Sequence, residues 1–330
     1  MAKPKIGFYW CASCGGCEEA VVDLAEDILA VTAAVDIVFW PVAMDYKKAD
    51  VTSLPDQALT ATFINGAIRT SEQEEMARLL RAKSRYLIAF GACAQLGGIP
   101  ALANEFSREA ILSWVYQDAP TVVNPERVRP AVRTDDDGRT LTLPEFRNVV
   151  RTLNQVVEVD YYLPGCPPTP KLIKAAVGAL LEGKLPPRGT VLAPDVALCE
   201  ECPRKKTKPQ DLHFTAFKRP HLVPLDPELC LLAQGLVCMG PATRGGCGAL
   251  CPGANMPCTG CFGPTSRGRD QGAKMLSSLT SAMEAKEVPE VEKVLAGIPD
   301  PVGTFYRYGL AGSLLRVNTT AAAAASKEAL

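Results

Sequence analysis

The segment Ile6–Leu24, IGFYWCASCGGCEEAVVDL, places Cys11, Cys14 and Cys17 between a strand-like run and a helix-like run. In a strand–loop–helix connection of this kind, a phosphate-binding loop has glycines at the position of these cysteines. Thiols at the same position predict metal ligation in place of phosphate binding. The segment therefore indicates an α/β fold whose first connecting loop carries sulfur chemistry.

Strand-like and helix-like segments alternate from residue 4 to residue 185, which predicts a parallel sheet with helices on both faces. The expected strands are residues 5–10, 35–42, 59–66, 85–90 and 156–163, and the expected helices are residues 18–34, 70–83, 105–117 and 170–182. A hairpin turn is expected at Asp137-Gly138. Pro186 and Pro187 mark a linker, so we expect one domain over residues 1–185 and a second over residues 186–330, with a helix near 269–285 and a low-complexity tail.

Four cysteines follow the carboxyl ends of predicted strands in the first domain. Cys14 and Cys17 follow the first strand, Cys93 follows the strand at 85–90, and Cys166 follows the strand at 156–163. Ligands bind at this edge of open α/β sheets. Three distant segments are therefore expected to bring four thiols to one edge.

The composition excludes several classes of function. The formal net charge is −1, with 35 basic and 36 acidic residues, which gives no electrostatic basis for binding nucleic acid or an anionic membrane. No secretory signal and no run of about 18 uncharged apolar residues is visible, so we expect a cytoplasmic protein without direct membrane insertion. Thirteen cysteines in such a chain indicate metal ligands rather than disulfides.

Eight of the cysteines lie between residues 195 and 265, a stretch rich in glycine and proline with little periodicity. By spacing, twelve cysteines form three sets of four: Cys14, Cys17, Cys93 and Cys166; Cys199, Cys202, Cys230 and Cys238; and Cys247, Cys251, Cys258 and Cys261. Cys11 is left over, and we expect it to be a buried thiol. Four thiolates can hold either a structural zinc or a [4Fe–4S] cluster.

Two features favour iron–sulfur clusters over zinc. Proline follows Cys166, Cys202 and Cys251, as in ferredoxin-type runs, and the surrounding loops are glycine-rich. The two-knuckle spacing of a zinc ribbon is not present. A zinc-stabilised scaffold protein nevertheless stays an alternative at this point.

Few side chains other than the cysteines suggest a catalytic role. His213 and His221 are isolated, and we expect both to be exposed loop residues. Glu18 and Glu19 fit the polar first turn of a helix, with proton transfer near Cys17 as the second interpretation. Electron transfer needs no general acid or base, so no residue of this chain is assigned as catalytic.

The motifs CGGCEE, GACAQLGGIP, PGCPPTP and CLLAQGLVCMGPATRGGCGALCPGANMPCTGCFGP resemble the small subunit of [NiFe] hydrogenases, from residue 4 to about residue 310. The resemblance is greatest to the methyl-viologen-reducing type that works with heterodisulfide reductase, and to its deazaflavin-reducing relative. It implies a flavodoxin-like domain that holds a proximal cluster with Cys14, Cys17, Cys93 and Cys166. It implies a distal cluster on Cys199, Cys202, Cys230 and Cys238, and a medial cluster on Cys247, Cys251, Cys258 and Cys261.

Two departures from the family pattern bear on cluster type. Many relatives have a histidine where this chain has Cys199, and many have a three-iron medial cluster where Cys251 here supplies a fourth thiol. Both changes imply three [4Fe–4S] clusters. The resemblance further implies a large subunit that carries the nickel–iron site, which this chain lacks, and an iron–sulfur or flavin protein as electron acceptor. A deazaflavin-reducing enzyme and a non-hydrogenase oxidoreductase with the same clusters are the alternatives.

Overall fold

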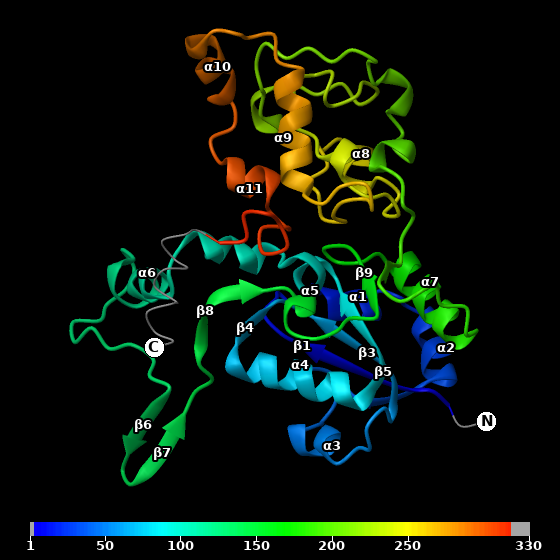
Figure 1. Cartoon of the computed structure of the whole chain (residues 1–330), viewed down its shortest axis with the longest axis vertical. Coiled ribbons are helices and arrows are strands. Elements are labelled where there is room, and N and C mark those ends of the chain that lie inside the picture. The colour runs from blue at the N-terminus through cyan, green and yellow to red at the C-terminus, as the bar shows by residue number, and fades with distance from the viewer. Residues whose placement is uncertain (1–2, 318–330) are drawn as a thin grey trace.

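The computed structural model describes residues 3–317 and contains a six-stranded parallel sheet in the order β10-β9-β5-β3-β1-β2 (Figure 1). The strands are β1 (Lys5–Trp10), β2 (Asp36–Phe39), β3 (Leu59–Asn65), β5 (Ser84–Phe90), β9 (Tyr161–Leu163) and β10 (Thr190–Val191). Counted along the chain, the order begins 2-1-3-4-5, as in flavodoxin-like sheets. The predicted fold class is therefore confirmed.

Helices cover both faces of this sheet. The face covered by α1 (Gly16–Val22) and α7 (Pro170–Leu181) packs Val21 and Ile173 against Phe8, in a core that also holds Cys17. The opposite face is covered by α3 (Lys48–Thr52), α4 (Ser71–Lys83) and α5 (Ala92–Leu96), and its core includes Leu80. The strands are buried on both sides because parallel sheets need a cover on each face.

Four of the predicted elements have wrong bounds, and the strand expected over 35–42 covers only Asp36–Phe39. The helix expected over 18–34 is two helices, α1 and α2 (Asp27–Ala34), because Ala25 adopts a left-handed conformation with φ of 51°. The strand expected over 156–163 begins only at Tyr161, since a 3₁₀ turn at Leu153–Gln155 precedes it. The helix expected over 105–117 is a 3₁₀ turn at Ile99–Glu105, then α6 (Arg108–Ser113), then a π-helical turn at Trp114–Asp118.

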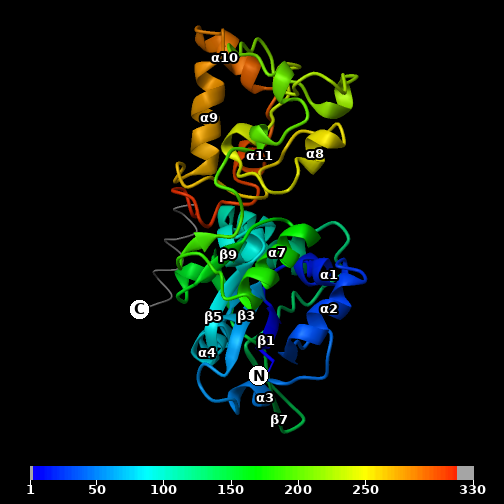
Figure 2. The same ribbon diagram turned by 90° about the vertical axis from the view of Figure 1, so that its right-hand side faces the viewer.

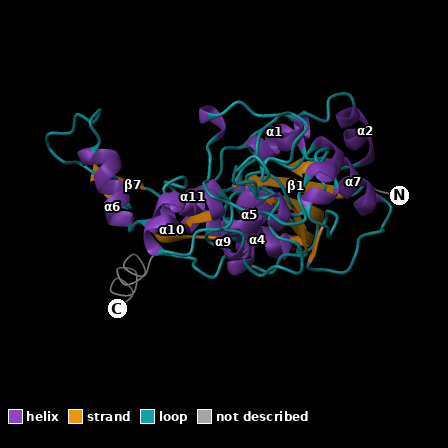
Figure 3. Ribbon diagram, turned by 90° about the horizontal axis from the view of Figure 1, so that it is seen from above, coloured by secondary structure: helices purple, strands orange, loops and turns teal. Residues whose placement is uncertain are grey.

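A projecting arm separates β5 from β9. It contains the expected hairpin, with β6 (Arg133–Asp136) and β7 (Arg139–Thr142) joined through Asp137 and Gly138, whose φ angles are 46° and 75°. Figures 1 and 3 show the hairpin and α6 extending away from the sheet. The arm returns through β8 (Phe146–Arg151), which pairs antiparallel with β4 (Ile68–Thr70), a small sheet that the sequence did not predict.

The chain beyond β10 forms a second part that is stacked on the carboxyl edge of the sheet (Figures 1 and 2). Its regular elements are α8 (Leu250–Gly253), α9 (Gln271–Ser281), α10 (Val288–Leu295) and α11 (Pro301–Phe305), with short 3₁₀ turns between residues 198 and 242. Cys238 and Cys258 lie in its main core beside Leu236 and Met275. Thiols thus occupy positions that aliphatic side chains fill in most cores.

Two connections fix the second part to the first. The last described residues cross back to α5, where Gly98 N–H donates to the Tyr308 carbonyl at 2.9 Å and Gly312 N–H donates to Leu96 at 3.1 Å. Arg244 is buried and holds the segment that leaves β10, since it donates to the Pro194 carbonyl at 3.2 Å and pairs with Asp195 at 2.9 Å. None of the helices in residues 3–317 combines the length and the apolar character that a membrane crossing requires.

Candidate metal centres

The loop between β1 and α1 presents Cys14 and Cys17 at the carboxyl edge of the sheet. Gly15 begins the helix from a left-handed conformation, with φ of 84°, so the chain turns sharply between the two cysteines. Cys14 is exposed, and Cys17 is buried against the sheet. Cys93 lies in the first turn of α5, directly after β5, and Cys166 follows β9, as the sequence predicted.

The four thiols of this proximal set are neighbours. Burial raises the pKa of the Cys17 thiol, and the nearby Cys93, Cys166 and Cys14 thiols raise it further. Burial also raises the pKa of Cys93 to about 12, with added contributions from Cys166 and Cys14. Metal coordination would offset these shifts, because a cation stabilises thiolates.

Two glycines leave room beside these sulfurs. A Cβ atom on Gly91 would fall closer than 3.0 Å to the Sγ of Cys17, and one on Gly98 would fall equally close to the Sγ of Cys93. Their φ angles are 86° and 60°. The segment GACAQLGG therefore forms a glycine cradle, in which the two glycines add no side chain beside these sulfurs.

The distal set also lies together. Burial raises the pKa of Cys199 to about 11, which Lys208 opposes and Cys238, Cys202 and Cys230 reinforce. A small cavity of about 20 Å³ is lined by all four of these cysteines. The Cys230 loop is held by the buried Arg204, which donates to the carbonyls of Asp226 and Leu229 at 3.0 Å each.

The medial set lies between the other two. Burial raises the pKa of Cys261 to about 12; a backbone hydrogen bond from Cys166 lowers it, and Cys247, Cys166 and Cys251 raise it. At the other end, Cys258 N–H donates to the Sγ of Cys238 at 3.3 Å. Cys258 is therefore adjacent to both the distal and the medial thiols, a position that its spacing in the sequence did not indicate.

The thiols of each set are grouped without forming a closed single-ion site. Across residues 3–317, no group of three or more His, Cys, Asp or Glu side chains converges in a way that would hold one metal ion. Cys11 is separate from the sets: it is 5% exposed and packs in the core on the face of the sheet opposite to that of Cys17. The structure thus places Cys11 as a buried thiol.

Glu18 stabilises the loop between β1 and α1 through buried hydrogen bonds. It is buried and accepts hydrogen bonds from Trp40 Nε1 and Asn65 Nδ2, both at 2.9 Å. Asn65 Oδ1 in turn accepts from Ser13 Oγ at 2.9 Å, which ties the cysteine loop to the end of β3. Burial raises the pKa of Glu18, and the two hydrogen bonds oppose that shift.

Sequence reasoning missed the partners Trp40 and Asn65, although each stands at or just after a strand end, where a ligand-binding edge is built. Glu19 is exposed, as are the two histidines; His213 Nδ1 lies 3.8 Å from Glu284 Oε1.

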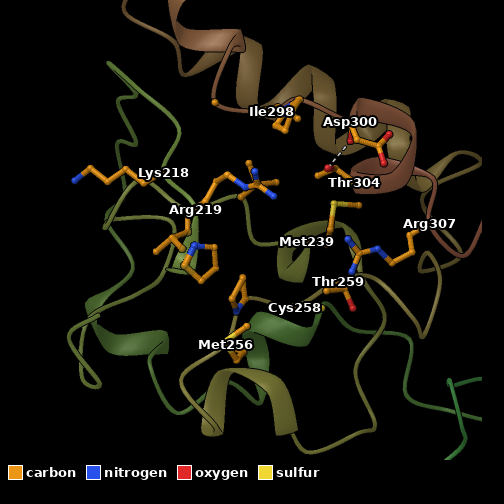
Figure 4. Close-up of a pocket in the computed structure, with 16 residues that line it drawn as sticks. Lys218, Arg219, Met239, Met256, Cys258, Thr259, Ile298, Asp300, Thr304 and Arg307 are labelled. Carbon is orange, nitrogen blue, oxygen red and sulfur yellow. Dashed lines mark hydrogen bonds between the residues drawn. The ribbon is translucent and has the colours of Figure 1, made fainter. Parts of the chain in front are cut away.

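A cavity of about 340 Å³ opens beside the medial set (Figure 4). Cys258 and Met239 contribute to its wall, and Lys218, Arg219 and Arg307 place positive charge around it. Asp300 also lines the cavity, but its carboxylate accepts from Gly303 N–H at 2.8 Å and so caps α11. The opening beside Cys258 is thus predominantly cationic.

Residues 14–180 match the protein family described as NADH ubiquinone oxidoreductase, 20 Kd subunit. The iron-sulfur subunit of the F420-non-reducing hydrogenase of Archaeoglobus profundus is 38% identical over 94% of this chain and 97% of its own length. The corresponding chain of the F420-non-reducing hydrogenase of Methanothermobacter thermautotrophicus is 39% identical over 95% of this chain and 96% of its own length. A chain of the [NiFeSe] hydrogenase from Desulfovibrio vulgaris Hildenborough shares the fold, with a TM-score of 0.50 and 18% identity over 80% of this chain and 94% of that one. The two relatives from F420-non-reducing hydrogenases cover nearly the whole of this chain, and the chain therefore belongs to the family of hydrogenase small subunits.

Proposed function

We propose that this chain is the electron-transferring subunit of a cytoplasmic [NiFe] hydrogenase and binds three [4Fe–4S] clusters. The observation that supports this most strongly is the convergence of Cys14, Cys17, Cys93 and Cys166 from three separate strand ends onto one edge, around the glycine cradle. The residues fit such a group, because each set offers four cysteine thiols, and in the proximal set Gly91 and Gly98 place no side chain against the sulfurs of Cys17 and Cys93.

The proposed ligands are the three sets of cysteines described above. The proximal cluster would be held by Cys14, Cys17, Cys93 and Cys166, the medial cluster by Cys247, Cys251, Cys258 and Cys261, and the distal cluster by Cys199, Cys202, Cys230 and Cys238. When bound, such clusters supply one-electron transfer. The protein's part is to hold the thiols, to exclude water from those that are buried, and to set the distance between sets.

The contacts between sets support the order proximal, medial, distal. Cys166 of the proximal set donates its backbone N–H to Cys261 of the medial set. Cys258 of the medial set donates its N–H to Cys238 of the distal set. A path from the exposed Cys14 to the distal thiols thus passes through directly contacting ligand segments.

The proposed partner at the proximal end is the hydrogenase large subunit, which would contain the nickel–iron site. Cys14 is exposed there, and Trp10, 39% exposed, lies over Gly15 beside it. At the distal end we propose an iron–sulfur or flavin acceptor, such as a heterodisulfide reductase complex. The two archaeal relatives belong to hydrogenases named as F420-non-reducing, which favours this acceptor class over a deazaflavin.

Metal and sulfide analysis of this chain with its large subunit, purified without oxygen and separated from the acceptor, tests the proposal. We expect about twelve irons and about twelve sulfides per copy of this chain, from four of each per cluster. Nickel should co-purify in a larger subunit. Zinc in place of iron would refute the electron-transfer function, and clusters without nickel would favour a non-hydrogenase oxidoreductase.

A further inference from the structure

Glu201 joins the distal and medial ligand segments. It lies inside the Cys199–Cys202 loop, and its Oε1 accepts hydrogen bonds from the backbone N–H groups of Gly246 at 2.9 Å and Gly248 at 3.0 Å. The same oxygen lies 3.8 Å from the Sγ of Cys247. One carboxylate of the distal loop therefore holds the turn that presents a medial thiol.

The two hydrogen bonds point the backbone N–H groups of Gly246 and Gly248 toward the Glu201 carboxylate and not toward a sulfur. Backbone N–H groups around a cluster thiolate stabilise added negative charge and so raise the reduction potential of the cluster. At this turn, Gly246 and Gly248 donate to Glu201, and the carboxylate adds a negative charge beside Cys247. Both effects favour the oxidised state of a cluster bound there.

Two nearby cations are engaged elsewhere, whereas a third, Lys208, acts on the Cys199 side of the loop. Arg244 pairs with Asp195 at 2.9 Å and donates to the Pro194 carbonyl, and Lys205 pairs with Glu200 at 2.6 Å. Within residues 3–317, no ion pair neutralises Glu201.

We infer that Glu201 is a positioning residue whose fixed negative charge lowers the reduction potential of the cluster held by Cys247, an inference that rests on the proposed function. Reduction of that cluster adds a negative charge near the carboxylate of Glu201, which makes the reduced state less favourable. An electron therefore moves on from the medial cluster and is not retained there. The residue acts through Cys247 and the turn around it.

The variant E201Q isolates the charge, because a glutamine Oε1 can still accept from both N–H groups. The matched control is E200Q, which removes a charge from the same loop at an exposed side chain already paired with Lys205. At an effective dielectric constant of about 20, a unit charge within about 12 Å changes the ratio of reduced to oxidised cluster about tenfold or more. For one electron, tenfold corresponds to about 59 mV.

The experiment is a redox titration of the purified complex followed by electron paramagnetic resonance. We expect E201Q to raise the midpoint potential of the cluster held by Cys247 by about 59 mV or more, together with that of the distal cluster on Cys199 and Cys202, while E200Q moves the potential of the cluster held by Cys247 far less. If E201Q binds less iron than the wild type, the variant E201D, which keeps the charge, is titrated in its place. A midpoint potential of E201D equal to that of the wild type supports the inference, and a raised midpoint potential overturns it. Full iron content with an unmoved potential in E201Q overturns the inference alone, whereas a wild-type complex without iron and sulfide overturns the proposed function and the inference with it.

Discussion

Replacing Gly91 with alanine should remove the proximal cluster without unfolding the sheet. Gly91 has φ of 86° and ψ of 169°, a region open almost only to glycine, and a side chain there costs about 1–3 kcal/mol. The new Cβ would also meet the Sγ of Cys17 at less than 3.0 Å. The backbone cannot retreat easily, because Gly91 N–H donates to Leu163 at 2.8 Å and Ala92 N–H donates to Gly165 at 2.7 Å. The strain is therefore relieved by displacing Cys17.

The assay is iron content of the purified complex, together with thermal unfolding. We expect G91A to contain about eight irons per chain in place of about twelve, because one cluster of four is lost. The control is G138A, at a hairpin position with φ of 75° and no atom within 4 Å of the new Cβ. That variant should lose only about 1–2 kcal/mol of stability from its left-handed backbone and keep all its iron. A G91A complex with about twelve irons would refute the cradle argument.

Three further substitutions test other contacts. Cys17→Ser should lose about four irons and abolish H2-dependent dye reduction, and full activity would contradict the proximal assignment. Cys11→Ser should keep about twelve irons, since Cys11 packs on the other face of the sheet, and a loss of about four would show it to be a ligand. Arg244→Ala should lower the free energy of unfolding of the purified complex by about 1–3 kcal/mol, because the Pro194 carbonyl and Asp195 lose their hydrogen-bond donor. A denaturation midpoint equal to that of the wild type would show that these contacts are dispensable.

The sequence predicted those features that depend on short-range pattern. Alternating apolar runs located most of the strands of the sheet, and the cysteines after 85–90 and 156–163 were correctly placed at strand ends. The single helix expected over 18–34 failed because Ala25 takes a positive φ, which no residue preference indicates for alanine. The short strand β10 was missed because two residues carry no periodicity.

Contacts between distant loops could not be predicted in the same way. The Glu18–Trp40 hydrogen bond joins residues that are 22 apart, and the Glu201–Gly246 contact joins residues that are 45 apart. In the cysteine-rich part, the position of Cys258 between two sets depends on a turn that brings its N–H to Cys238. Spacing groups cysteines along the chain, whereas the order of the sets in space follows from these contacts.

The thiols in the main core of the second part tie its folding to the supply of iron. Cys238 and Cys258 are buried among Leu236, Met239 and Met275, and their pKa values are raised by that burial. A newly made chain without metal would have to close long glycine-rich loops without the stabilisation that ligation provides. We therefore expect the sheet to form first and the second part to remain open to proteases until metal arrives. In a cell short of iron, the steady level of this protein would then fall through degradation, even at constant synthesis.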